Sequence, residues 1–271
     1  MTPSDPTMPP KEATMDPSPV ETLLGGQVVI RQSPDGYRAG MDAALLAAAC
    51  GPAPGERAAR DGIELGCGPG AALLQVARRQ PDLNLTGLDI DPAALSLAQD
   101  NIAANGLADR VSVHAGDIAA GFAATGLARA GLVFCNPPFF DHPAQMRAPK
   151  AAREQAWMNT AGLVVWCAFA LAACRDGGQI VFIHRADRLY DLLNGLSPKA
   201  GSFQIRPVQS FAGDPAKRVI VRAQRLGKAP LRLLAPLVLH TDRTEADGSG
   251  RVGHSPEAEA ILYGRAGLEW L

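Results

Sequence analysis

Three short motifs carry residue types that can do chemistry. The segment Glu64–Gly70 (ELGCGPG) places a carboxylate before three glycines, Asp89 follows an apolar run, and Asn136–Phe139 reads NPPF. Glycines let a backbone approach a ligand closely, a carboxylate accepts hydrogen bonds from hydroxyl groups, and an amide oxygen accepts from an N–H group. Together they indicate a nucleotide-like cofactor beside a substrate that presents a nitrogen.

The glycine motif is expected to end a strand and open a helix, where nucleotide-like ligands bind. The spacing of Gly66, Gly68 and Ala71 also fits a dinucleotide fingerprint. Glu64 favours S-adenosylmethionine instead, because its carboxylate would repel a pyrophosphate and can take the ammonium group of S-adenosylmethionine, directly or through water. A purely structural glycine turn remains an alternative.

Two acidic segments extend the candidate cofactor site. Asp89 can accept hydrogen bonds from both ribose hydroxyls, and Ile90 can cover one face of adenine. Asp117 can accept from the adenine amine, with Ile118 supplying a backbone N–H. Asp91 is interpreted as a helix N-cap, and the same explanation remains open for Asp89 and Asp117.

The NPPF turn is the candidate reaction site. An aryl amine or an amide is a poor nucleophile because its lone pair is delocalised. Hydrogen bonds from its N–H groups to the Asn136 side-chain oxygen and the Pro137 carbonyl would localise that pair. The prolines stiffen the loop, and Phe139 can stack on an extruded base. The alternative is an ordinary proline turn after a strand.

The elements expected around these motifs alternate between strand and helix. This order predicts an α/β fold, a Rossmann-like and mostly parallel seven-stranded sheet with helices on both faces. Closely spaced strand-like segments near the end predict an antiparallel edge. The expected strands end at Leu65 or span Leu83–Leu88, Val111–His114, Leu132–Cys135, Gln179–Ile183, Phe203–Phe211, Arg218–Ala223 and Leu231–His240.

The organisation expected along the chain is a tail and one domain. Residues 1–20 are rich in proline and polar residues, without the apolar segment of a signal peptide, and are expected to be disordered. Residues 21–271 are expected to form a single domain with an N-terminal extension. That extension is a hairpin over Leu23–Ile30 followed by a helix over Ala43–Cys50, with Asp42 as N-cap.

The composition limits the possible functions. A net charge of −1 means that any nucleic-acid contact depends on local basic patches. The five cysteines form no C-x-x-C pair, which indicates buried thiols in a reducing cytoplasm. The histidines lack metal-ligand spacing, so no metal is expected. The most apolar stretch, Ala161–Cys174, is too short to span a bilayer.

The order of these motifs resembles that of class I S-adenosylmethionine-dependent amino-methyltransferases. The upstream segment Gln32–Asp42 (QSPDGYRAGMD) resembles more specifically the bacterial tRNA (adenine-N(6))-methyltransferases, and the similarity runs from about Leu23 to the C-terminus. That family modifies the adenine beside the anticodon of a valine tRNA. The family often has Tyr where Phe139 stands, and the proline-rich tail has no counterpart.

The resemblance implies that Tyr37, Arg38 and Asp42 lie close to the cofactor, and that Asn136 and Phe139 serve the target base. The candidate cofactor-binding residues are Tyr37, Arg38, Asp42, Glu64, Gly66, Cys67, Gly68, Asp89, Ile90, Asp117, Ile118 and Asn136. The candidate catalytic residues are Asn136, Pro137 and Phe139. The candidate substrate-binding residues are Pro138, Phe140, Arg147, Lys150 and Arg153.

Two basic sets are candidate RNA contacts. Arg147, Lys150 and Arg153 follow the NPPF turn and can hold phosphates beside the reaction. The second set comprises Lys217, Arg218, Arg222, Arg225, Lys228 and Arg232. Solvated charges that serve solubility explain each set equally well.

Three other functions remain open. A methyltransferase for ribosomal RNA guanine or for a protein glutamine amide would use a similar NPP-aromatic turn. A Rossmann oxidoreductase would bind a nicotinamide dinucleotide and would not need Asn136. A degenerate binding module would have no turnover at all.

Overall fold

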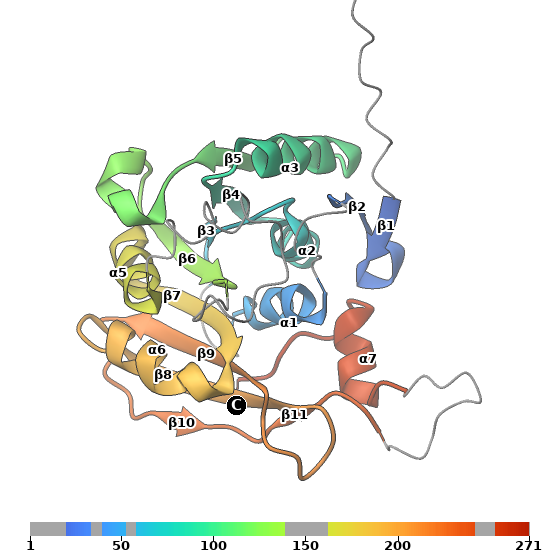
Figure 1. Cartoon of the computed structure of the whole chain (residues 1–271), viewed down its shortest axis with the longest axis vertical. Helices are drawn as coiled ribbons and strands as arrows, with labels where there is room; N and C mark the ends of the chain where they lie inside the picture. The colour runs from blue at the N-terminus through green and yellow to red at the C-terminus, as the bar shows by residue number, and fades with distance from the viewer. Residues whose placement is uncertain (1–19, 34–39, 53–57, 139–161, 242–252, 271) are drawn as a thin grey trace, which may run out of the picture.

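The computed structural model describes residues 20–33, 40–52, 58–138, 162–241 and 253–270. These residues form one large twisted sheet with helices on both faces and a separate two-stranded hairpin (Figure 1). The expected α/β arrangement is therefore confirmed. The tail lies outside the described residues, and the division into a tail and a single domain stays a prediction.

The large sheet contains nine strands in the order β10-β8-β9-β7-β6-β3-β4-β5, with β11 also paired to β8. Strands β3 to β7 run parallel, and β9 runs antiparallel to both of its neighbours, β7 and β8. The seven longer strands match the expected seven-stranded sheet. They are β3 (Asp61–Leu65), β4 (Asn84–Asp89), β5 (Val111–Ala115), β6 (Ala130–Cys135), β7 (Cys174–Arg185), β8 (Ala200–Gln209) and β9 (Arg218–Arg225).

The prediction of one antiparallel strand over Leu231–His240 was wrong. The structure has two two-residue strands there, β10 (Arg232–Leu233) and β11 (Leu237–Val238), and both run parallel to β8. The interruption includes Pro236, whose nitrogen has no hydrogen to donate to a strand partner.

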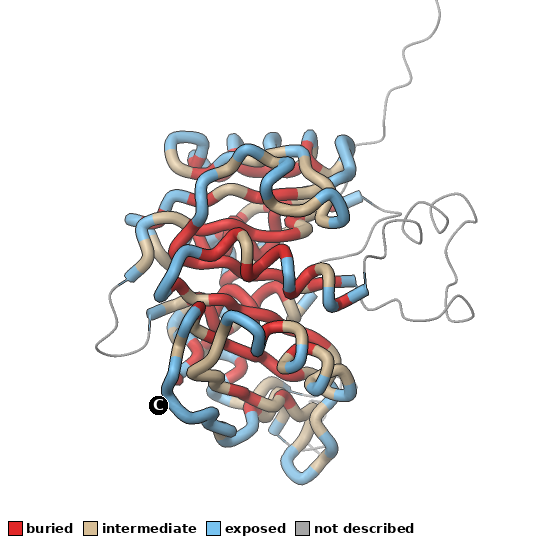
Figure 2. Tube along the Cα trace, turned by 90° about the vertical axis from the view of Figure 1, so that its left-hand side faces the viewer, coloured by how far each residue is buried: buried red, intermediate tan, exposed pale blue. Residues whose placement is uncertain are grey.

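Helices cover the sheet on two faces, which Figure 2 shows as buried strands beneath exposed outer segments. Four helices pack on one face with the larger apolar cluster, and two pack on the other. The first group is α1 (Met41–Ala49), α2 (Ala71–Arg79), α3 (Pro92–Ala104) and α7 (Pro256–Leu262); the second is α5 (Leu163–Ala173) and α6 (Leu189–Leu196). Between β5 and β6 the described chain forms only two short 3-10 turns, η2 (Ile118–Ala120) and η3 (Phe122–Thr125).

Helix α6 was missed by the sequence analysis. It has only eight residues, and it contains Gly195, which lowers helix propensity. The signal that could have revealed it is the spacing of Leu189, Leu192, Leu193 and Leu196, which places these side chains on one face.

The N-terminal hairpin is present as expected and is held by two asparagines of α3. Strands β1 (Val20–Leu23) and β2 (Val28–Arg31) pair antiparallel. The Asn101 side chain bonds both the N–H and the carbonyl of Arg31, at 2.8 and 2.9 Å. Asn105 bonds the same two groups of Val29, at 2.9 and 2.6 Å. The two side-chain amides thus make the backbone hydrogen bonds to β2 that a neighbouring strand would make.

All five cysteines are free and buried, as expected from their apolar surroundings. Burial raises the pKa of each thiol, to about 12 for Cys167 and Cys174. In the described part of the chain, no helix is long and apolar enough to cross a membrane. The same residues contain no cluster of side chains suited to a metal ion.

Candidate cofactor and reaction site

The three chemical motifs meet at one edge of the sheet. Leu65 pairs with Leu88 of β4 on one side and with Cys135 of β6 on the other. Because these strands are parallel, the residues that follow them emerge at the same edge. The glycine motif, Asp89 and Asn136 therefore lie side by side, although long stretches of sequence separate them.

The glycine loop is held by the end of β4. The backbone N–H groups of Gly66 and Cys67 both donate to the Leu88 carbonyl, at 2.7 and 3.0 Å. Gly66, Gly68 and Gly70 all have positive φ, which only glycine adopts without strain. A Cβ on Gly68 would meet no atom of the described residues within 4 Å, which leaves room there for a ligand.

Trp166 of α5 closes the other side of the loop. A Cβ on Gly66 would lie 2.8 Å from Cη2 of Trp166, whose side chain is buried in the cluster under α5. Gly66 is thus required both by its positive φ, +67°, and by the indole ring. Trp166 was missed because nothing distinguishes it from the other apolar residues of its helix.

Asp89 links β4 to the glycine loop. Its Oδ2 accepts from the Gly68 N–H at 2.8 Å, and its Oδ1 accepts from the Asp91 N–H at 3.0 Å. Each carboxylate oxygen has a second lone pair, so these bonds orient Asp89 and leave acceptor capacity for a ligand. Asp91 caps α3 through the Ala93 N–H, with Pro92 at the first helical position, as the sequence predicted.

Glu64 is a buried carboxyl group behind the loop. Its side chain is 4% exposed, and Oε2 has no hydrogen-bond partner within the described residues. Burial raises its pKa well above the ordinary value, a hydrogen bond from the Leu73 backbone opposes this rise, and the charge of Asp89 adds to it. A cation bound nearby would favour the ionised form and offset its burial.

The segment that contains Asp117 lies at the same edge of the sheet. Gly116 donates its N–H to the Asp89 carbonyl at 2.9 Å, so Asp117 follows directly beside β4. Asp117 accepts from the Ala119 N–H at 2.8 Å and caps η2, so the capping alternative is correct for one of its oxygens. Ile90 is 44% exposed, as an apolar cover for a ligand ring must be. Ile118 packs partly against the cluster under α5.

Asn136 presents an unsatisfied acceptor. Its Oδ1 is buried and has no hydrogen-bond partner among the residues that the structure describes. This oxygen can accept a hydrogen bond from an N–H group of a substrate. Pro137 is buried and Pro138 is exposed, so the first proline anchors the turn.

Asp42 lies differently from the expectation, whereas Cys67 is buried like the other cysteines. The Cys67 thiol points at Gly87, where an added Cβ would meet Sγ at 2.7 Å, so this side chain fills the core. Asp42 is not the N-cap of α1, because Gly40 holds that position without a side-chain bond. Asp42 lies in the first turn and pairs with Nε of Arg218 at 3.0 Å.

Several candidate residues lie outside the described part of the chain. They are Tyr37, Arg38, Phe139, Phe140, Arg147, Lys150 and Arg153. Their proposed roles stay predictions.

Asn101 is a positioning residue that the sequence analysis missed. Besides holding Arg31, its side-chain nitrogen donates to the Pro69 carbonyl at 2.9 Å, so one amide joins α3, the hairpin and the glycine loop. The available signal was a polar residue, 2% exposed here, beside the apolar positions of the same helix.

The members of the second basic set differ in how far they are exposed. Arg222 is 1% exposed and lies over the Trp270 ring at 5.3 Å. Arg225 is 7% exposed and pairs with Asp176 at 2.8 Å. These two side chains belong to the interior and cannot contact RNA phosphates, whereas Lys217 is exposed at the other end of β9.

Known proteins similar to this chain are methyltransferases. Residues 43–156 match the family model of the methyltransferase small domain. A Porphyromonas gingivalis protein named tRNA1(Val) (adenine(37)-N6)-methyltransferase is 30% identical over 70% of this chain and 76% of its own length. A Dickeya chrysanthemi protein of the same name is 29% identical over 64% of this chain and 68% of its own length.

Two further similarities are more limited. A ribosomal protein uL3 glutamine methyltransferase of Bradyrhizobium diazoefficiens is 31% identical over 48% of this chain and 42% of its own length. The crystal structure of a predicted O-methyltransferase from Agrobacterium tumefaciens has a TM-score of 0.66 and 24% identity, over 84% of this chain and 98% of that one. The structural similarity confirms the class I methyltransferase fold.

Proposed function

Since the chain belongs to the family of the tRNA1(Val) (adenine(37)-N6)-methyltransferases, we propose that it transfers a methyl group from S-adenosylmethionine to N6 of an adenine in tRNA, near the anticodon. It is an S-adenosylmethionine-dependent N-methyltransferase. Its substrate is RNA, and a cytoplasmic location is part of the same proposal because tRNA is the substrate.

The observation that carries the proposal is the buried Oδ1 of Asn136 at the carboxyl end of β6, which accepts no hydrogen bond from any described residue. An exocyclic amine donates two N–H groups, and this oxygen can accept one of them. The Pro137 carbonyl follows in the same turn and can accept the other. Held in this way, the nitrogen has its lone pair localised and directed, so orientation supplies most of the rate increase and no strong base is needed.

The residues at the neighbouring strand ends fit S-adenosylmethionine. Glu64 has a buried oxygen without a partner among the described residues, which suits a cationic group. No described atom fills the space beside Gly68, and Asp89 is held with its carboxylate at the loop. We assign the ribose hydroxyls to Asp89, one face of the adenine to Ile90 and the adenine amine to Asp117. The bound cofactor supplies an electrophilic methyl group on a sulfonium.

A second substrate class has one observation in its favour. The relative that methylates a glutamine of ribosomal protein uL3 matches 137 residues of this chain. A glutamine amide also has two N–H groups and a delocalised lone pair, so the same two acceptors would serve it. Its match covers less than half of that protein, which favours the adenine substrate.

The decisive test is methyl transfer from labelled S-adenosylmethionine to total tRNA that lacks this modification, with nucleoside analysis of the product. Labelled N6-methyladenosine is the expected product. Label in ribosomal RNA or in protein, with none in tRNA, would keep the methyltransferase activity and overturn the tRNA substrate. Heat-denatured protein provides the control.

A further inference from the structure

Two arginines face each other at the end of the sheet beside the reaction site. In the antiparallel pairing of β7 with β9, Arg185 lies directly opposite Arg218. Lys217 precedes Arg218, and its carbonyl accepts from the Ala186 N–H at 3.2 Å. Three cations thus lie on adjacent strand ends, a placement that suits an anionic ligand.

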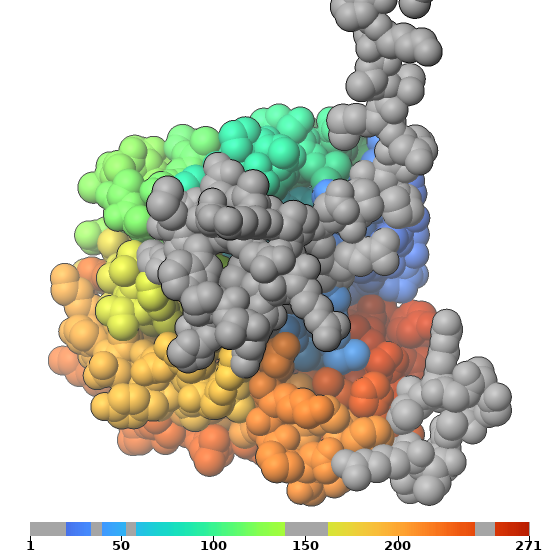
Figure 3. All heavy atoms as spheres, in the orientation of Figure 1, coloured from blue at the N-terminus to red at the C-terminus, as the bar shows by residue number. Residues whose placement is uncertain are grey.

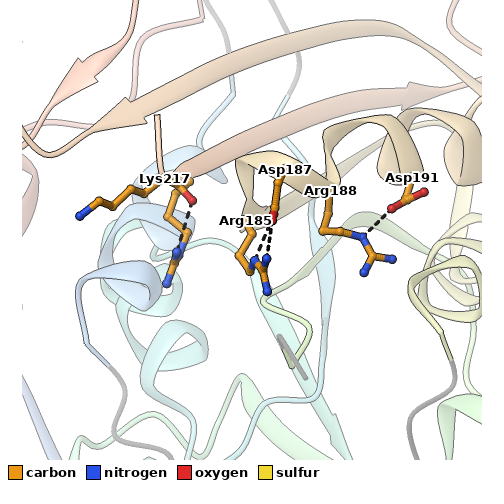
Figure 4. Close-up of polar contacts among 6 residues, drawn as sticks. Arg185, Asp187, Arg188, Asp191 and Lys217 are labelled. Atoms are coloured by element: carbon orange, nitrogen blue, oxygen red, sulfur yellow. Dashed lines mark hydrogen bonds and ion pairs between the residues drawn. The ribbon is translucent and has the colours of Figure 1, made fainter. Parts of the chain in front are cut away.

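Each arginine of this group is oriented by a carboxylate. Asp187 pairs with Nε and Nη2 of Arg185 (Figure 4). Asp42 pairs with Arg218. Arg185 lowers the pKa of Asp187 through a side-chain hydrogen bond, so this carboxylate stays ionised at neutral pH. These pairs are partly exposed, and such pairs contribute little stability.

An ion pair and a carboxylate lie near these three cations. Arg188 pairs with Asp191 at the start of α6. Asp214 lies in the loop before Lys217 and carries a charge of opposite sign. The net charge of the group is thus not strongly positive, and the placement of its cations matters more than this net charge.

Lys217 is the exposed member of the group. Its ammonium forms no ion pair with any residue that the structure describes, and Figure 4 shows its side chain extending away from the other labelled side chains. Figure 3 shows the orange atoms of the β8–β9 region beside the blue atoms of α1, on the face turned to the viewer. A phosphate can approach Lys217 from solvent.

The distance to the reaction site suits a neighbouring nucleotide. Phe182 of β7 pairs with Cys135 of β6, so Arg185 lies three residues beyond the level of Cys135. Three residues of strand span about 10 Å, and adjacent strands lie about 5 Å apart. Asn136 follows Cys135 directly, so the Arg185 backbone lies roughly 10 Å from it. That span is comparable to one or two nucleotides.

We propose that Arg185, Lys217 and Arg218 form a phosphate-binding surface for the RNA backbone flanking the methylated adenine. The proposal rests on the function proposed above and names a contact surface for that RNA. Lys217 and Arg185 bind phosphate directly, and Asp187 and Asp42 hold the two arginines in place. Phosphate contacts of this kind set the register of the RNA, and base contacts select the adenine.

A pair of charge-reversal variants tests the surface. Lys217→Glu changes the proposed surface, and Lys199→Glu is a matched control, because Lys199 is also exposed and precedes β8 beside the opposite end of β9. The measurements are the Kd for unmodified tRNA at several salt concentrations, the Kd for S-adenosylmethionine and the methylation rate. Arg185→Ala serves as a second variant that does not introduce a negative charge.

Lys217→Glu is expected to raise the Kd for tRNA at least about threefold and to reduce the slope of log K against log salt by about one. The Kd for S-adenosylmethionine should not change, and Lys199→Glu should behave as wild type. Equal effects of Lys217→Glu and Lys199→Glu on tRNA binding would overturn the surface. If the wild-type protein methylates no tRNA, the proposed function fails instead, so the two failures are distinguishable.

Discussion

The carboxylate of Asp89 accepts a hydrogen bond from the backbone N–H of Gly68 at 2.8 Å. This bond joins the group proposed to hold the ribose to the loop proposed to approach the rest of the cofactor. Any change in Asp89 therefore acts on both parts of the site at once. The two residues are 21 positions apart in sequence, and they meet because β3 and β4 are neighbours.

Asp89→Asn should weaken binding of S-adenosylmethionine by about 10- to 100-fold, because hydrogen bonds to a charged group contribute about 1.5–3 kcal/mol. Isothermal titration calorimetry measures the change. Asp91→Asn is the matched control, since Asn caps a helix as well as Asp does. An equal loss of affinity in both variants would contradict the ribose role of Asp89.

Asn136→Ala should retain S-adenosylmethionine binding and lose most methyl transfer. Removing one positioned polar group from an active site typically lowers kcat by about 100-fold or more. Single-turnover methylation at saturating cofactor measures the effect. Asn194→Ala, at an exposed position of α6, should keep the wild-type rate. A full rate in Asn136→Ala would remove this residue from the mechanism.

Binding of S-adenosylmethionine should release a proton from Glu64. Its pKa is raised by burial, and the positive charge of the cofactor lowers it again by favouring the ionised form. Affinity should then increase with pH below the raised pKa, by up to about tenfold per pH unit. Calorimetry in two buffers of different ionisation enthalpy counts the released protons.

The same shift predicts the stability of the protein without cofactor. Because the folded pKa lies above the unfolded one, Glu64 costs stability above its ordinary pKa, increasingly until the raised pKa is passed. Glu64→Gln should therefore melt at a higher temperature than wild type as pH rises through that window, and should lose the pH-dependent affinity. The exposed Glu257→Gln should do neither. Absence of proton release in wild type would contradict the assignment.

Gly66→Ala should mainly lower stability, and Gly68→Ala should mainly lower cofactor affinity. The first places a Cβ 2.8 Å from the Trp166 ring, whereas the second places a Cβ more than 4 Å from every atom of the described residues. Both place a non-glycine residue at positive φ, which destabilises the fold by about 1–2 kcal/mol. Gly66→Ala should therefore lose more free energy of unfolding, and Gly68→Ala should lose mainly cofactor affinity. Urea denaturation and calorimetry separate the two quantities.

A double-mutant cycle tests the cause of the Gly66 effect. Trp166→Leu removes the ring that the new Cβ would meet, so it should offset part of the loss in Gly66→Ala. The same Trp166→Leu change should not improve Gly68→Ala. Strictly additive losses for Gly66→Ala and Trp166→Leu would show that the ring does not confine the loop.

The site could be predicted to the extent that it depends on local chemistry. Asp91 and Pro92 begin α3 as the sequence predicted, because capping involves atoms only two residues apart. The fully buried β6 was expected from its continuous apolar run, and it is a central strand. Strand ends shifted by one to five residues, most at the start of β7, because hydrogen bonds to neighbouring strands decide where a strand begins and stops.

By itself, the sequence determined the alternation of strands and helices, the glycine loop at a strand end and the order of the acidic and NPPF motifs, because each depends on residues that are close along the chain. The tertiary structure alone decided which residues contact one another across the fold. It placed Trp166 against Gly66, buried Arg222 in the interior and set Arg185 opposite Arg218. Such contacts depend on which strands and helices become neighbours, and a single sequence carries no local signal of that choice.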